Sequence, residues 1–369
     1  MKLIPSPHER DLAAMCRSLL AAECPTTLAR GPQADRMPER LWKALAGAGL
    51  LGLAIDESHG GSGGYLSDLG VFSVEAGRAL CPNVVHSTVI AALAIDWLGG
   101  PGARARWLPE LASGSVRGTS ALFNTRDAAV VTPVLHAHND EGLWRLDGSA
   151  DFVADADLAD LIVITAGTDD AAGGTLGFVV ETGAQGVSIE PLQLMGGHPA
   201  FTVRFDEVTV ADPGAVFAAG SRDLRRVANA AVALHCLDLV GVGEAVIQRT
   251  VDHTKVREQF GRPIASFQAA QHLVADMHIA VSAARLAAQS AAFWIGRGRV
   301  ATRETAIARM RAAAVKQVTL DAHQLHGGMG YVVDTDLHLF SERARVLSTW
   351  GGGADIAAKW LDTVRDRKD

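Results

Sequence analysis

Three long stretches in the second half of the chain carry a helical pattern of apolar residues and are almost free of internal glycine and proline. They cover Asp223–Val256, Ser266–Gly296 and Thr302–Leu325. Helices of this length must bury an apolar stripe along most of their surface, and packing against one another achieves that. The pattern predicts a C-terminal four-helix bundle, with a final pattern over Asp336–Leu347 and Ile356–Arg365.

A basic, glycine-bearing turn, Arg257–Ile264, joins the first two of these stretches. Such a turn places a guanidinium beside exposed backbone N–H groups, which suits a phosphate or diphosphate. The alternative is that Arg257 only interacts with the carbonyl end of the preceding helix. The eight residues taken alone leave both interpretations open.

The first 215 residues divide into two parts by the period of their apolar residues. Residues 1–115 have helical spacing, at Leu12–Ala21, Arg40–Leu50, Ser67–Leu80, Ser87–Leu98 and Arg104–Leu111. Residues 116–215 have short β-rich runs between turns, at Thr119–Phe123, Leu143–Leu146, Leu161–Thr165, Leu176–Val180, Val187–Pro191 and Phe201–Phe205. We expect an α+β, mostly α fold: an N-terminal helical domain (1–115), a small antiparallel β domain (116–215) and the bundle (216–369).

Composition excludes several classes of function. The net charge is −7, so the chain lacks the basic field of nucleic-acid-binding proteins. We expect no signal peptide, because Met1–Arg10 is polar and interrupted by two prolines, and no membrane span, because no uninterrupted run of about 18 apolar residues occurs. The four scattered cysteines (Cys16, Cys24, Cys81, Cys236) match no metal-ligand spacing, so we expect reduced packing residues, no metal and a cytoplasmic location.

Two motifs in the bundle part carry a family resemblance. They are Arg257-Glu258-Gln259-Phe260-Gly261-Arg262-Pro263-Ile264 and Gln324-Leu325-His326-Gly327-Gly328-Met329-Gly330-Tyr331, supported by Gly52-Leu53 followed by Glu57–Gly63 near the N-terminus. On these residues the chain resembles the acyl-CoA dehydrogenases over essentially its whole length. The resemblance implies FAD and the α,β-oxidation of an acyl-CoA, in which a carboxylate takes the α proton and flavin N5 takes the β hydride.

The resemblance also assigns residues to the cofactor. In the family, the Arg motif and the Gln-Gly-Gly motif hold the ADP half of a neighbouring subunit's FAD. Carried over by motif position, the candidates are Arg257, Gln259, Phe260, Gln324, Gly327 and Gly328. Arg257 would face the diphosphate, and the two glycines would allow the ligand to approach the backbone closely.

The positions that carry the chemistry depart from the family. The glutamate of members with a C-terminal base falls on Gly351, which has no proton acceptor. The alternative base position, on the helix before the Arg motif, falls on or near Ala231. His235 and Asp238 lie four and seven residues further on and are weak candidates for a base, beside their interpretation as structural residues.

The flavin platform departs as well. The family's Thr-Glu-Pro-x-x-Gly-Ser and Trp-Ile-Thr segments correspond to Phe123–Ala129 and Phe152-Val153-Ala154, which lack the hydroxyl donors and the turn glycine at the matching positions. Losing hydrogen bonds to a buried ring should weaken binding by about 1–3 kcal/mol for each unsatisfied group.

Three hypotheses follow. The first is a degenerate, non-catalytic subunit like those of actinobacterial α2β2 acyl-CoA dehydrogenases that act on steroid side chains, active only with a homologous catalytic partner whose FAD it helps to hold. The second is a catalytically active homo-oligomer with His235 or Asp238 as an unusual base. The third is a CoA-thioester-binding or assembly protein without redox chemistry.

Overall fold

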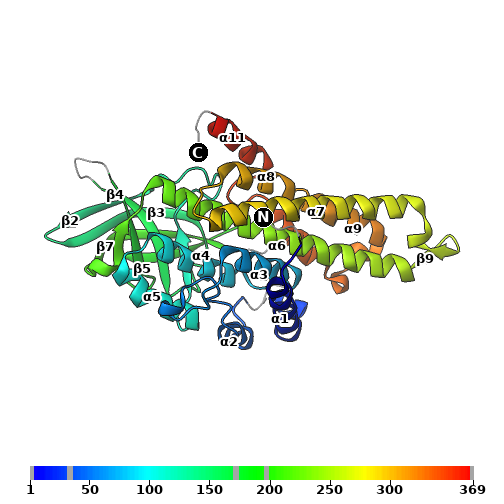
Figure 1. Cartoon of the computed structure of the whole chain (residues 1–369), viewed down its shortest axis with the longest axis horizontal. Helices are drawn as coiled ribbons and strands as arrows, with labels where there is room; N and C mark the ends of the chain where they lie inside the picture. Colours follow the sequence, from blue (N-terminus) through cyan, green and yellow to red (C-terminus); the bar gives the residue numbers. More distant parts are fainter. Residues whose placement is uncertain (1–3, 31–35, 169–173, 195–198, 366–369) are drawn as a thin grey trace. The chain divides into compact units, whose positions relative to one another are not determined.

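The computed structural model describes residues 4–30, 36–168, 174–194 and 199–365. The chain forms two compact units, each built from separate segments (Figure 1). Unit 1 contains residues 1–35, 67–81 and 232–369, and unit 2 contains residues 36–66 and 82–231. The units are described separately below.

Unit 2 is built around a mixed sheet. Its strands are β1 (Gly118–Ala121), β2 (Leu135–Asp140), β3 (Leu143–Ala154), β4 (Leu161–Thr168), β5 (Thr175–Glu181), β6 (Val187–Leu192), β7 (Ala200–Val210) and β8 (Val216–Ala218). The strand order is β6-β7-β3-β2-β4-β5-β8, with β1 beside β4. The sheet was predicted as antiparallel, but β4 pairs in parallel with both β1 and β2. Sequence patterns show where strands lie and not their direction. Strand β8 was missed because it has only three residues, and β2 because its mostly polar sequence, LHAHND, is not a β-rich run.

The helices of unit 2 bury their apolar residues, and those of α4 and α5 share one core with the sheet. Unit 2 holds α2 (Glu39–Gly47), α4 (Asn83–Leu98) and α5 (Pro101–Ser113). Every residue of α4 from Val84 to Ile95 is buried, as expected for a helix that is apolar on all sides. Proline at the first position of α5 needs no N–H partner, and Gly114 ends that helix in the left-handed conformation.

The regular secondary structure in the described residues of unit 1 is helical, apart from one small hairpin. Its helices are α1 (Pro7–Glu23), α3 (Leu66–Arg78), most of α6 (Ser221–Val256), α7 (Gln268–Gly296), α8 (Thr302–Ala312), α9 (Val315–His326), α10 (Leu337–Leu347) and α11 (Ala354–Arg365). The stretch predicted as one helix over Thr302–Leu325 is two helices, α8 and α9. Their junction, Ala313-Ala314, contains no glycine or proline, so the sequence carried no signal for the break.

Glycines let α6 lie directly against its neighbours. A Cβ on Gly77 would lie 2.0 Å from the carbonyl oxygen of Asp238, and a Cβ on Gly241 would lie 1.9 Å from that of Val74. A Cβ on Gly243 would meet the Val281 side chain at 2.6 Å, and α6 and α7 run side by side in Figure 1. Among the described residues α6 is long and apolar enough to cross a membrane, but 89% of that window is buried inside the protein, as in a core helix.

The predicted fold class is confirmed: helices come first, then a central sheet, then a second helical region. The domain limits 1–115, 116–215 and 216–369 remain predictions.

Candidate nucleotide-binding edge and the missing base

A two-residue β-hairpin follows α6 at the basic turn. Strand β9 (Glu258–Gln259) pairs with β10 (Arg262–Pro263), with Gln259 opposite Arg262. Phe260 and Gly261 have φ values of +55° and +79°, the type I′ geometry of a tight hairpin. A phenylalanine rarely adopts this conformation, and Phe260 is 93% exposed. The hairpin therefore holds an aromatic ring out in solvent at some conformational cost.

Arg257 lies at the base of this hairpin. Its N–H donates to the carbonyl of His253, and its carbonyl accepts from the Ile264 N–H at 2.9 Å. Its side chain is exposed, and no carboxylate of the described residues pairs with its guanidinium. The backbone is thus fixed by two hydrogen bonds while the charged group stays available to an anion.

The second motif lies at the end of α9. Gln324 is exposed, and its carbonyl accepts from the Gly327 N–H. Gly327 has φ +59° and ψ −138°, which an L side chain adopts only under strain. A Cβ on Gly327 or Gly328 would meet nothing within 4 Å, so the backbone here is open to close approach.

Two histidines bring these motifs together. The rings of His253, one turn before Arg257, and His326, directly before Gly327, stack at 4.3 Å between centroids and 21° between planes. The sequence did not reveal this pair, although His326 is part of the second motif and His253 lies four residues before Arg257. The signal lay in that adjacency, which the sequence cannot turn into a contact across about 70 residues.

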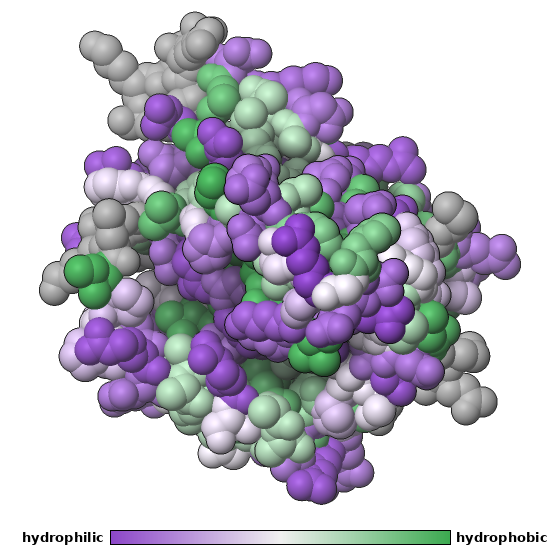
Figure 2. Space-filling view, turned by 90° about the vertical axis from the view of Figure 1, so that its right-hand side faces the viewer, coloured by the Kyte–Doolittle hydropathy of each residue, from purple (hydrophilic) through white to green (hydrophobic). Residues whose placement is uncertain are grey.

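The six predicted cofactor residues therefore lie on two segments in contact, the hairpin and the end of α9. We call these two segments, Arg257–Ile264 and Gln324–Gly328, the nucleotide edge. They fit the diphosphate end of FAD, because a guanidinium without a carboxylate partner and an open glycine backbone are the groups that such an anion needs. Figure 2 views the molecule from the side on which Figure 1 draws β9, and hydrophobic side chains in green lie there among hydrophilic ones in purple.

The loop expected to carry the base offers none. Gly351 is buried with φ +74°, and Gly352 follows with φ +106°. Arg309 fixes the loop: its side chain is fully buried and donates to the carbonyls of Leu347 and Trp350. Burial lowers the pKa of Arg309, since a charged group loses its hydration there.

The weak candidates His235 and Asp238 are both buried in unit 1. The His235 ring packs edge-on against Trp350, with 4.3 Å between centroids. Asp238 is fully buried and accepts two hydrogen bonds from Arg343, at 2.8 and 2.5 Å. Arg343 also donates to the Cys81 carbonyl at 2.7 Å, so it ties Asp238 into a structural ion pair. Ala231, at the alternative base position, is buried and has no polar side chain.

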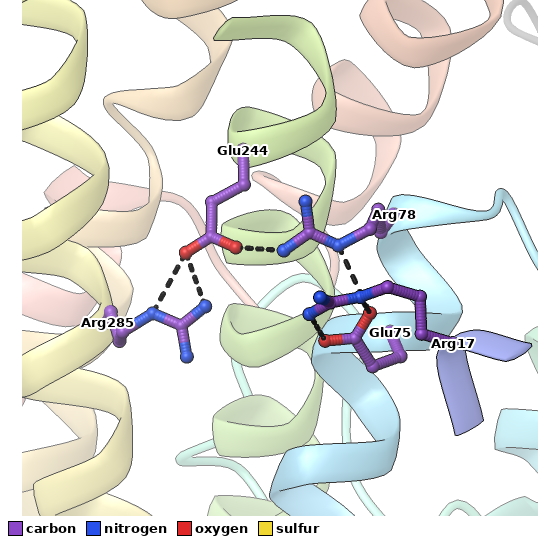
Figure 3. A network of polar contacts seen from close by, with 5 residues as sticks. All are labelled: Arg17, Glu75, Arg78, Glu244 and Arg285. Atoms are coloured by element: carbon purple, nitrogen blue, oxygen red, sulfur yellow. Dashed lines mark hydrogen bonds and ion pairs between the residues drawn. The ribbon is translucent and has the colours of Figure 1, made fainter. Parts of the chain in front are cut away.

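A second group of carboxylates in unit 1 is also paired. Figure 3 shows Glu244 between Arg78 and Arg285, and Glu75 between Arg17 and Arg78. Arg17 donates to both Glu75 oxygens, at 3.0 and 2.7 Å, and Arg78 donates to Glu75 at 3.1 Å. The network joins α1, α3, α6 and α7, and its carboxylate oxygens are occupied by guanidinium N–H groups.

Known proteins identify the family. The C-terminal domain of acyl-CoA dehydrogenases matches residues 220–361, and the N-terminal domain matches residues 6–115. Acyl-CoA dehydrogenase IpdE2 of Mycobacterium tuberculosis is 31% identical over 344 residues, covering 92% of this chain and 91% of that protein. The chain belongs to the acyl-CoA dehydrogenase family.

Solved structures agree with this assignment to the acyl-CoA dehydrogenases. A variant of the Tcur3481-Tcur3483 steroid ACAD has a TM-score of 0.85 and 30% identity, covering 97% of both chains. The ChsE4-ChsE5 complex from Mycobacterium tuberculosis has a TM-score of 0.88 and 26% identity, covering 100% of both chains. The predicted resemblance to heteromeric actinobacterial acyl-CoA dehydrogenases is thereby confirmed. Homologues in the family bind FAD.

In this chain, the segment that corresponds to the flavin platform of acyl-CoA dehydrogenases makes hydrogen bonds within itself. The Asn124 side chain accepts from the Arg126 N–H at 2.8 Å, and the Asp127 side chain accepts from the Ala129 N–H at 2.9 Å. The Arg126 guanidinium lies 5.1 Å from the centroid of the Phe152 ring. This segment of unit 2 thus uses its polar groups internally, and it does not fit a flavin ring as the nucleotide edge fits a diphosphate.

Proposed function

We propose that this chain is the non-catalytic subunit of a heteromeric FAD-dependent acyl-CoA dehydrogenase and that it supplies the ADP side of a partner's FAD site. One observation carries the proposal. The nucleotide edge keeps an available guanidinium at Arg257, while the position of the catalytic glutamate is Gly351. A chain that had lost every role in the reaction would have no physical need for an available guanidinium, and a complete enzyme would carry a carboxylate either at Gly351 or at the alternative base position, Ala231.

The roles of the residues follow from their chemistry. FAD, when bound, supplies the acceptor for the substrate's β hydride. Arg257 neutralises diphosphate charge, Gln324 hydrogen-bonds to the nucleotide, and Gly327 permits close approach of the backbone. Gln259, Phe260 and Gly328 shape the same edge. With glycine at 351, the chain itself does not remove the α proton, so that step belongs to the partner.

The partner is a homologous catalytic acyl-CoA dehydrogenase, in an α2β2 assembly located in the cytoplasm. The similarity to the ChsE4-ChsE5 complex and to the Tcur3481-Tcur3483 steroid ACAD supports a heteromer and a steroid side chain as the acyl group. An active homo-oligomer is less well supported, because Asp238 is held in a bidentate pair and His235 is packed against Trp350.

The decisive experiment is an absorbance spectrum with FAD stoichiometry, on the chain alone and co-expressed with a homologous acyl-CoA dehydrogenase encoded beside it. We expect little FAD and no dehydrogenase activity for the chain alone, and about one FAD per heterodimer in the complex. A yellow, fully flavinated and active homotetramer would overturn the proposal.

A matched pair of variants tests the role of the edge. Arg257→Ala in the complex should weaken FAD binding about 10- to 100-fold, because a charged hydrogen bond contributes about 1.5–3 kcal/mol. Arg262→Ala is the control, since that guanidinium lies on the same hairpin but stacks on Phe267 at 4.1 Å. Equal FAD retention in both variants would make the turn structural.

A further inference from the structure

The His253–His326 stack occupies a particular place in the nucleotide edge. His253 is on the last turn of α6, and the carbonyl of His253 accepts from the Arg257 N–H. The Nδ1 of His326 lies 2.8 Å from the carbonyl of Ala322 and must donate to it, since a carbonyl cannot donate. The Nε2 of His253 is buried and has no hydrogen-bond partner among the described residues. One imidazole is thus fixed, and the other has an unsatisfied nitrogen.

The charges around the stack are positive. Burial, the neighbouring His326 and the Arg257 guanidinium lower the pKa of His253. Burial lowers the pKa of His326 against the Ala322 hydrogen bond, with His323 and Arg249 adding to the effect.

The other titratable side chains near the stack, His323 and Asp336, already have hydrogen-bond or ion-pair partners. His323 has both ring nitrogens hydrogen-bonded, at 2.7 Å to the Gly330 carbonyl and at 2.6 Å to the Ser341 hydroxyl. Next to α10, Asp336 interacts electrostatically with Arg249 but forms its ion pair with Arg30, at 2.6 Å. No carboxylate of the described residues pairs with either histidine of the stack.

We propose that the His253–His326 stack is a proton-linked clasp of the nucleotide edge, such that a diphosphate bound at Arg257 draws one proton onto the stack. The inference rests on the proposed function and deepens it. No carboxylate of the described residues pairs with the stack, and a bound diphosphate would supply that negative charge. Protonated His253 would then have an N–H donor at Nε2, the nitrogen that has no hydrogen-bond partner. His253 and His326 are positioning residues here: they join the two motifs and adjust the charge between them.

The sign of the pH dependence follows from linkage. Bound diphosphate raises the pKa of the stack above its value in the empty edge, so binding takes up a proton. Affinity is then greatest below the pKa of the empty edge and falls as pH rises through the pKa of the bound state. The change amounts to as much as about tenfold for each unit by which binding raises the pKa.

The first test measures FAD retention by the assembled complex between about pH 6 and about pH 8, by flavin fluorescence after dilution. We expect wild type to hold FAD more tightly at the lower pH, and His253→Gln to lose most of that dependence. His138→Gln, an exposed histidine on β2, is the control and should behave as wild type. Affinity independent of pH in wild type, or the same dependence in His253→Gln, would overturn the inference.

A second measurement needs no variant. The apo complex is titrated with FAD near pH 7 by calorimetry, in PIPES and in Tris, whose ionisation enthalpies differ and which do not supply a competing phosphate. We expect net proton uptake, and no uptake overturns the clasp. The proposed function fails separately, if Arg257→Ala leaves FAD retention unchanged.

Discussion

Two regions of unit 1 use the same helix, α6, in opposite ways. At its C-terminal end, the nucleotide edge leaves Arg257 and Gln324 exposed, with no partner for the Arg257 guanidinium among the described carboxylates. In its middle, Asp238 and Glu244 are bound by arginines. Binding a ligand requires groups whose interactions are left unmade until the ligand arrives. A region whose charged groups are already paired is a structural core, and the middle of α6, with Asp238 and Glu244, is one.

The largest expected effect comes from breaking that core. Arg343→Met leaves Asp238 as a fully buried charge without its partner, and should lower the free energy of unfolding by about 3–5 kcal/mol. Denaturant unfolding of wild type and variant measures it. The double variant Arg343→Met with Asp238→Leu should recover much of the loss, because it removes the unpaired buried charge. No recovery in the double variant would contradict the assignment of these two residues as a structural ion pair.

A carboxylate placed back at the base position should also be costly. Gly351→Glu puts a side chain on a buried residue with φ +74°, so left-handed strain and burial of the acid should together destabilise by about 2–4 kcal/mol. The thermal midpoint of the variant tests this. A variant as stable as wild type would mean that the loop still has room for a catalytic glutamate.

The nucleotide edge offers a comparison between neighbouring glycines. Gly327→Ala should cost about 1–3 kcal/mol and reduce FAD retention, because only position 327 of the two has positive φ. Gly328→Ala is the control, since its added methyl also meets nothing within 4 Å. Equal FAD content and equal thermal midpoints in the two complexes would show that the backbone conformation at 327 is unimportant.

The smallest effect concerns acid stability of the chain without FAD. Burial and neighbouring cations lower the pKa of His253 below its usual value, so the unfolded chain binds the proton more readily. Stability should therefore decline as pH falls through the ordinary histidine range, and the decline should be shallower in His253→Phe. Thermal midpoints across that range are the measurement, and parallel curves would contradict the assignment.

The sequence predicted most of the helices and strands, because period and turn chemistry are local. It placed α6 within two residues of its bounds, yet began α1 five residues late and joined α8 and α9, whose alanine junction resembles any helix interior. Its two motifs also led to the segments of the nucleotide edge, whose role in binding FAD stays a prediction. It could not find the His253–His326 stack or the Arg343–Asp238 pair, because side chains about 70 and 105 residues apart meet only after the helices pack.

The glycines between α3 and α6 have a consequence for what the bundle can accommodate. Where Gly77 faces Asp238 and Gly241 faces Val74, the two backbones touch with less space than one methyl group requires. An acyl chain is as thick as a leucine side chain, so it cannot pass between these helices at this level. The close contact between α3 and α6 is a steric barrier, so an acyl chain bound to this unit would have to lie elsewhere.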